Sequence, residues 1–183
     1  MLPIFQLQDV FFGYEGVPAL RGLSLQIAQG ERVALLGANG SGKSTLLRIL
    51  DALCFAERGS VSFDGQRFSA ELFQRDDFSL AFRRRVALVF QNPDVQLFNP
   101  TVFDEVAFGP LQLEWPKEKI LTRVAETLEL MGIAHLRERP PYRLSGGEKK
   151  RVALASVIVL DPDVLLLDEP TATLDPRSQS QVI

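Results

Sequence analysis

The chain has 183 residues, 46% of them hydrophobic, which is enough for one substantial core and lies within the usual size of a single domain. Its 20 basic and 23 acidic residues give a formal net charge of -3. This balance argues against nucleic acid as a partner, because such proteins carry excess positive charge to neutralise phosphates. One cysteine excludes an internal disulfide, and no apolar run approaches the roughly 18 residues that span a bilayer. We expect a cytosolic chain that reaches a membrane only through a partner.

The first strands are expected near the N-terminus. Residues 5–12 are rich in β-branched and aromatic side chains, and apolar and polar residues alternate over 23–27. Both patterns are typical of half-exposed strands. We therefore predict a hairpin-like antiparallel start.

A glycine-rich turn follows a short apolar run at 32–36 and precedes helical spacing at 45–50. The turn fits the pattern G-x-x-x-x-G-K-[ST] in the strand, loop and helix context that this pattern requires. Its glycines let the backbone fold around an anion, Lys43 can reach the β- and γ-phosphates of a nucleotide, and Ser44 can bind Mg²⁺. The predicted ATP-binding residues are Gly37, Ala38, Asn39, Gly40, Ser41, Gly42, Lys43, Ser44 and Thr45.

Two further apolar runs, at 86–90 and 164–168, read as strands that are buried on both faces. Between them, apolar residues recur at helical spacing over 117–131, and another helix is expected from Ser145 onward. Strands of this kind separated by helices indicate an α/β fold with a parallel sheet.

The second of these strands ends in two carboxylates, Asp168 and Glu169. Ligands bind at the carboxyl ends of the strands in an open parallel sheet. Asp168 is therefore a candidate for holding Mg²⁺, and Glu169 for polarising a water that attacks the γ-phosphate. Taken alone, the pair could also be a solvated acidic turn.

The segment 144–148 reads Leu-Ser-Gly-Gly-Glu. Ser145 can cap the helix that follows, while Gly146 and Gly147 leave backbone N–H groups exposed at its positive end, which is a second anion site. The segment resembles the signature motif of the ABC ATPases. In that family two subunits pair head to tail, and each signature closes over the nucleotide of the other, so the resemblance implies a dimer.

The same resemblance assigns roles to three more residues. Tyr14 resembles the aromatic residue that stacks on adenine, with plain hydrophobic packing as the alternative interpretation. Gln91 resembles the glutamine that links Mg²⁺ and catalysis to the transporter contact. Asp175 resembles the nucleotide-binding aspartate of the loop after the acidic strand.

The resemblance covers essentially the whole chain. It implies a P-loop ABC ATPase domain over 1–183, with an antiparallel β part at the N-terminus and a helical signature subdomain at approximately 99–160. The family also carries a switch histidine further along, but this chain ends 14 residues after Glu169. We therefore expect an ATPase domain that is truncated at its C-terminus, and we expect the sole histidine, His135, to lie on the surface.

A narrower resemblance lies at 90–98 and 101–110, which are similar to the cobalt and energy-coupling-factor importers. It implies an ATPase that uses ATP and Mg²⁺ to energise uptake of cobalt, nickel or a vitamin. The implied partners are a second ATPase subunit, a transmembrane coupling subunit and a substrate-capture membrane subunit. The implied location is the cytoplasmic face of the cell membrane.

Two other functions stay open. One is a soluble ABC ATPase that acts on ribosomes or DNA. Such proteins tend to carry tandem ATPase domains, coiled coils or basic arms, and the sequence shows none. The other is a partner subunit that binds nucleotide without hydrolysing it.

Overall fold

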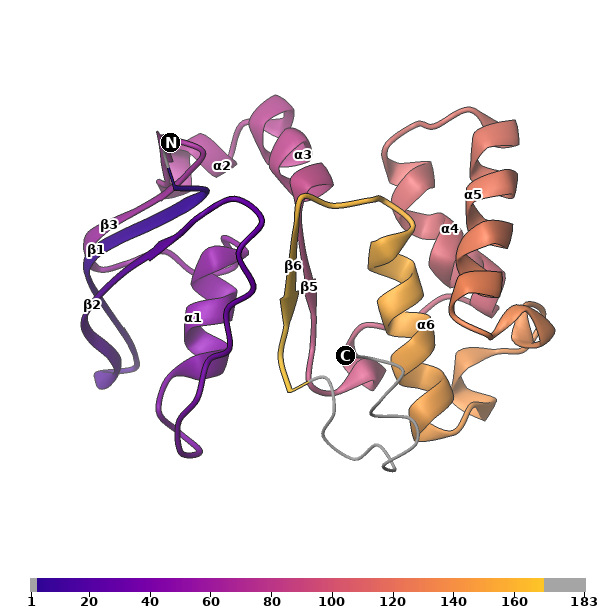
Figure 1. The fold of residues 1–183 in the computed structure, drawn as a ribbon, viewed down its shortest axis with the longest axis horizontal. Coiled ribbons are helices and arrows are strands. Elements are labelled where there is room, and N and C mark those ends of the chain that lie inside the picture. The colour runs from indigo at the N-terminus through magenta and orange to yellow at the C-terminus, as the bar shows by residue number, and fades with distance from the viewer. Residues whose placement is uncertain (1–2, 170–183) are drawn as a thin grey trace. The chain divides into compact units, whose positions relative to one another are not determined.

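The computed structural model describes residues 3–169, so Asp175 lies outside the described residues. The chain forms two compact units, Met1–Phe82 and Arg83–Ile183, and each is described by itself (Figure 1). The assignment of 1–183 to one ABC ATPase domain with a subdomain at about 99–160 stays a prediction.

The first unit contains an antiparallel sheet in the order β2-β1-β3-β4. The strands are β1 Phe5–Tyr14, β2 Val17–Ile27, β3 Arg58–Phe63 and β4 Gln66–Arg67. β1 pairs with β2 from Phe5 opposite Ile27 to Tyr14 opposite Val17, with irregularities in the register along the way. The predicted antiparallel start is confirmed.

Three helices accompany this sheet: α1 Lys43–Leu50, α2 Ala70–Phe73 and α3 Asp76–Arg85. The core of the unit is strongly aromatic. Edge-to-face or tilted ring contacts, with centroids 5.0 to 6.5 Å apart, join Phe5, Phe63, Phe68, Phe73 and Phe82. Such pairs add stability beyond the area they bury, and here they fix β1 and β3 against the helices that follow.

The predicted strand at 32–36 is wrong for this structure. The segment has no regular secondary structure and is not part of the sheet, and Leu36 is 93% exposed and Val33 43% exposed. A strand requires a neighbour that supplies its backbone hydrogen bonds, and in the first unit β1 to β4 pair only among themselves. The apolar run therefore precedes the glycine-rich turn without forming a ladder.

The second unit contains the parallel pair β5 Val86–Val89 and β6 Val164–Leu167. Their register runs from Val86 opposite Val164 to Val89 opposite Leu167. Both predicted strands and their parallel direction are confirmed. β5 is buried along its whole length, whereas in β6 only Leu166 is buried, so the expectation of two covered faces fits β5 better.

Helices make up most of the second unit: α4 Val102–Gln112, α5 Lys117–Leu130 and α6 Gly146–Ile158, with short 3₁₀ turns at η1 Pro93–Val95, η2 Ala134–Leu136 and η3 Pro141–Arg143. The helices predicted over 117–131 and from Ser145 are confirmed. His135 is exposed, as expected.

Helix α6 lies between the β5–β6 pair and the helices α4 and α5 (Figure 1). It contributes residues to two hydrophobic clusters of this unit. Val152, Ala155 and Val159 pack with the buried residues of α4 and α5, whereas Ala153 and Leu154 pack with Val89 of β5. The helix thus joins the parallel pair to the helical layer. Among residues 3–169, no helix combines the length and the apolar character that crossing a membrane requires.

Candidate functional site: a phosphate loop and an acidic strand edge

The glycine-rich loop of the first unit ends at Gly42, which caps α1 in the left-handed conformation with φ of 92°. A Cβ at Gly42 would lie 2.6 Å from the carbonyl oxygen of Ala19, so only glycine fits without a shift of the backbone. No side chain caps the first turn of α1, and that turn contains no acidic residue. The N–H groups of this positive helix end therefore face no competing carboxylate of the helix itself, which suits an anion.

The ammonium of Lys43 is folded back over the loop. Its Nζ donates to the carbonyl oxygens of Gly37 at 2.9 Å and of Ala38 at 3.0 Å. The N–H of Ser41 donates to the carbonyl oxygen of Ala38 at 3.1 Å and closes a turn over Asn39 and Gly40. The lysine thus spans a concave loop of backbone groups, which is the arrangement that binds phosphate.

Three further predicted residues lie in this unit. Ser44 and Thr45 occupy the first turn of α1, where Thr45 is buried. Tyr14 ends β1 and is 41% exposed, with its ring edge-to-face on Phe12 at 5.0 Å and its hydroxyl 3.4 Å from the Arg48 guanidinium that donates to it. The partly exposed ring is compatible with stacking, and its contact with Phe12 shows that packing also holds it.

In the second unit, the parallel direction of β5 and β6 brings the ends of both strands to one edge. The N–H of Asp168 continues the ladder by donating to the carbonyl oxygen of Val89 at 3.0 Å. Just beyond, Nε2 of Gln91 donates to Oε2 of Glu169 at 2.7 Å. The structure thus places three predicted residues, Gln91, Asp168 and Glu169, at the carboxyl edge of this pair of strands.

A lysine that the sequence analysis did not select also reaches this edge. Lys150, on α6, is only 7% exposed, and its Nζ donates to the backbone carbonyl oxygen of Glu169 at 3.4 Å. Burial lowers the pKa of Lys150, and attraction to Glu169 opposes that shift. The sequence signal was available, because Lys150 shares a helical face with Ala153 and Leu154, which pack toward β5.

The start of α6 forms a complete capping box. The N–H of Glu148 donates to Oγ of Ser145 at 3.4 Å, and the N–H of Ser145 donates to Oε2 of Glu148 at 2.7 Å. The bond from the Ser145 backbone, followed by the Ser145 hydroxyl and nearby arginines, lowers the pKa of Glu148. A Cβ at Gly146 would meet nothing within 4 Å, so the first turn is open on that side. The predicted helix end is confirmed as an accessible one.

The segment after Gln91 is fastened to α6. The ammonium of Lys149 lies 2.6 Å from Oδ1 of Asp94 in η1, and Nε2 of Gln96 donates to the carbonyl oxygen of Ala153 and to Oγ of Ser156 at 3.0 and 3.1 Å. Neither Asp94 nor Gln96 received a structural role from the sequence. These contacts couple the strand edge to the helix that carries the 144–148 motif.

The candidate residues therefore fall into two groups. The loop at 37–45 and Tyr14 belong to the first unit, and Gln91, Asp168, Glu169, Ser145, Gly146 and Gly147 belong to the second. Among residues 3–169 there is no cluster of three or more His, Cys, Asp or Glu side chains that could hold a metal unaided.

The chain is similar to known proteins along most or all of its length. A family model described as ABC transporter matches residues 20–172. The nickel import ATP-binding protein NikO of Rhodobacter capsulatus is 61% identical over 182 residues, which are 100% of this chain and 72% of that protein. The energy-coupling factor transporter ATP-binding protein EcfA of Methanothermobacter thermautotrophicus is 44% identical over 98% of this chain and 57% of its own length.

A solved structure gives the same result for the fold. The cbiO1 protein of Clostridium perfringens, described as part of the ABC transporter complex cbiONQ, superposes with a TM-score of 0.84 at 38% identity. The match covers 100% of this chain and 71% of that one.

Proposed function

The chain belongs to the ABC transporter family as an ATP-binding ATPase subunit, and from this premise we propose that it energises the import of nickel or cobalt ions. The contact between Gln91 and Glu169 beside Asp168 carries the proposal of hydrolysis, since it presents a carboxylate and an amide at one strand edge. The name of the 61% identical NikO relative supports the choice of cargo.

Phosphate binding is the task of the first unit in this proposal. The N–H groups at the positive end of α1 and the ammonium of Lys43 bind the β- and γ-phosphates. Tyr14 stacks on the adenine. The loop residues from Gly37 to Thr45 form the phosphate-binding site.

Mg²⁺ fits the donors that the chain offers. Ser44 in the first unit supplies a hydroxyl, and in the second unit Asp168 supplies a carboxylate and Gln91 an amide oxygen. Each of these is a hard oxygen donor of the kind that Mg²⁺ prefers, together with phosphates and waters. When bound, Mg²⁺ neutralises charge that develops on the phosphates.

Glu169 acts on the attacking water. Its carboxylate orients the water and accepts a hydrogen bond from it while the oxygen attacks the γ-phosphorus in line and the bond to the leaving ADP oxygen breaks. Gln91 holds that carboxylate through its Nε2, so the orientation of Glu169 depends on the segment that follows β5. The carboxylate belongs to the second unit and the phosphate loop to the first.

The open helix end at Ser145, Gly146 and Gly147 is assigned to the nucleotide held by a second ATPase subunit, homologous or identical to this one. Its backbone N–H groups and the positive end of α6 suit a phosphate. Asp175, which lies outside the described residues, is proposed to assist at the same nucleotide. ATP binding then closes the dimer and hydrolysis reopens it.

A surface beyond Gln91 is proposed as the docking site of a transmembrane coupling subunit, with a separate membrane protein capturing the ion. It exposes four large apolar side chains, Val95, Phe98, Phe108 and Leu111. Buried Glu105 fixes the loop beneath them by accepting the N–H groups of Phe98 and Asn99 at 2.8 and 2.7 Å. A rigid exposed apolar surface is typical of a protein interface, and it would place the chain at the cytoplasmic face of the membrane.

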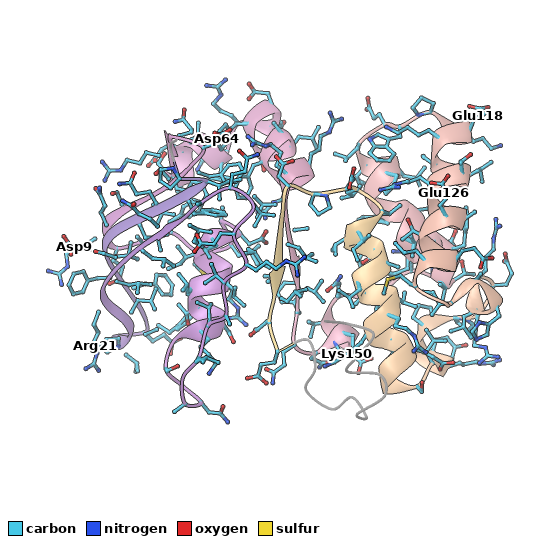
Figure 2. The ribbon with its side chains drawn as sticks, viewed as in Figure 1. Asp9, Arg21, Asp64, Glu118, Glu126 and Lys150 are labelled. Atoms are coloured by element: carbon cyan, nitrogen blue, oxygen red, sulfur yellow. The ribbon has the colours of Figure 1, made fainter. Side chains whose placement is uncertain are left out.

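Two measurements test the proposal on the wild type, Glu169→Gln and the control Glu118→Gln. The first is the rate of ATP hydrolysis by each protein, and the second is the uptake of radioactive nickel by cells that contain it. Glu118 is exposed on α5 (Figure 2). We expect Glu169→Gln to reduce the hydrolysis rate by about 100-fold or more and to abolish uptake, since general-base assistance contributes that much. The Glu118→Gln protein should behave as the wild type.

Three outcomes separate the alternatives. Nucleotide binding without hydrolysis in the wild type would establish a non-hydrolysing partner. Hydrolysis with recovery of ribosomes or DNA and no membrane subunit would establish a soluble ABC ATPase. If the cells took up another solute in a hydrolysis-dependent way, but neither nickel nor cobalt, only the proposed identity of the cargo would be contradicted.

A further inference from the structure

Lys150 is the one charged residue of α6 that is buried, at 7% exposed, among the described residues of that helix. It is labelled on α6 in Figure 2. The neighbouring Lys149 instead pairs with Asp94 near the surface. A buried ammonium costs folding free energy unless polar groups compensate it. The compensation here includes the carbonyl oxygen of Glu169.

Glu169 has an unusual backbone. Its φ is 47°, in the left-handed region that residues with a side chain occupy at a cost. Two parts of the chain hold Glu169: Gln91, after β5, donates to its side-chain carboxylate, and Lys150, on α6, donates to its backbone carbonyl oxygen. The direction of the carboxylate therefore depends on both contacts.

We propose that Lys150 is a positioning residue for hydrolysis, which holds the backbone of Glu169 and so links the helix of the 144–148 motif to the carboxylate that orients water. This inference rests on the proposed function. Lys150 acts through the peptide carbonyl of Glu169, while Gln91 acts through its side chain. A displacement of α6 is transmitted directly to Glu169 by this contact.

The experiment compares Lys150→Met, Lys150→Arg and the surface control Lys117→Met in the purified protein. Lys117 is exposed in the first turn of α5. Methionine has similar length and fills the space without a charge, whereas arginine retains a charged donor. The measurements are kcat, KM for ATP and the midpoint of thermal unfolding.

For Lys150→Met we expect kcat to fall about tenfold, because a hydrogen bond from a charged donor is lost, while KM stays within about twofold. The unfolding temperature should stay equal or rise, since an apolar residue replaces a buried charge. Arginine should restore most of kcat, and Lys117→Met should change neither quantity. If Lys150 had only a structural role, Lys150→Met would lower the unfolding temperature and would not affect kcat selectively.

An unchanged kcat in Lys150→Met would overturn the inference and leave the proposed function intact. The inference would also be overturned if Lys150→Met lowered both kcat and the unfolding temperature, and if Lys150→Arg restored neither of them. If the wild type itself does not hydrolyse ATP, the proposed function fails, and amide hydrogen exchange over 164–169 decides the contact separately. Faster exchange in Lys150→Met would support the anchoring of Glu169, and unchanged exchange would contradict it.

Discussion

Between residues 3 and 169, two helices begin at a glycine-rich motif, and they begin in different ways. Helix α1 starts at left-handed Gly42 with no side-chain cap, whereas α6 starts at Ser145 with a full capping box from its own Glu148. A helix leaves four N–H groups without partners in its first turn. The first turn of α1 has no side-chain cap and no acidic residue of its own, while Ser145 and Glu148 satisfy two donors at the start of α6, where a Cβ at Gly146 would meet open space. The difference shows that two glycine-rich helix starts can be built differently, one from backbone conformation alone and the other from a reciprocal pair of side-chain hydrogen bonds.

Of the substitutions that test this comparison, Gly42→Ala is expected to have the largest effect on stability. Substitution Gly42→Ala places a Cβ at positive φ, 2.6 Å from the Ala19 carbonyl oxygen and 2.9 Å from Leu20 Cδ2. We expect the free energy of unfolding to fall by about 3 kcal/mol, from backbone strain together with overpacking. Urea denaturation followed by circular dichroism measures it. A loss below about 1 kcal/mol would show that the loop can relax around the added methyl group.

Lys43 tests the ligand side of the same helix end. We expect Lys43→Ala to weaken ATP binding by about 10- to 100-fold, which is the contribution of a charge-assisted hydrogen bond, while the fold is retained. Isothermal titration calorimetry with ATP gives the dissociation constant, with Lys117→Ala as the matched surface control. Equal affinity in the two variants would contradict the assignment of the loop to phosphate.

The capping carboxylate of α6 gives a smaller effect that depends on pH. Glu148→Ala should lower the free energy of unfolding by about 1 kcal/mol at pH 7. The pKa of Glu148 is lowered in the folded state by its bonds to Ser145. Its stabilisation is therefore present above the unfolded pKa of 4.5 and is lost as the pH falls through the lower folded value.

The control for this prediction is Glu148→Gln, which can keep the hydrogen bond of the capping box without a titrating group. Unfolding of the three proteins is compared at pH 7 and at successively lower pH. The difference between wild type and Glu148→Ala should shrink on acidification. A difference that grew would contradict the depressed pKa.

The smallest effect is expected at Gly146, the counterpart of Gly42. A Cβ there meets open space and the backbone is helical, so Gly146→Ala should raise the free energy of unfolding by at most about 1 kcal/mol. The same urea denaturation measures it. A destabilisation as large as that of Gly42→Ala would remove the distinction between the two helix ends.

The sequence predicted those elements whose signals are local. Ser145 predicted the start of α6, the apolar spacing over 117–131 predicted α5, and the glycine-lysine pattern located the loop before α1. The second half of the capping box, Glu148, was seen only in the structure. The apolar run at 32–36 failed because a strand is a property of two segments, and local composition does not supply the neighbour.

The same reason limits prediction of the site. Gln91 and Glu169 are 78 positions apart, and their 2.7 Å contact follows from the parallel pairing of β5 with β6. Motifs could select both residues but could not show that one holds the other. The sequence analysis did not select Lys150, because its burial depends on which face of α6 packs against the strands.

The folded-back ammonium of Lys43 has a consequence for nucleotide affinity. By donating to the carbonyl oxygens of Gly37 and Ala38, the lysine uses acceptors of its own loop in the place that the oxygens of a bound phosphate would take. An incoming phosphate must compete with these two carbonyl groups for the ammonium, so the affinity gained from Lys43 is the difference between two sets of hydrogen bonds.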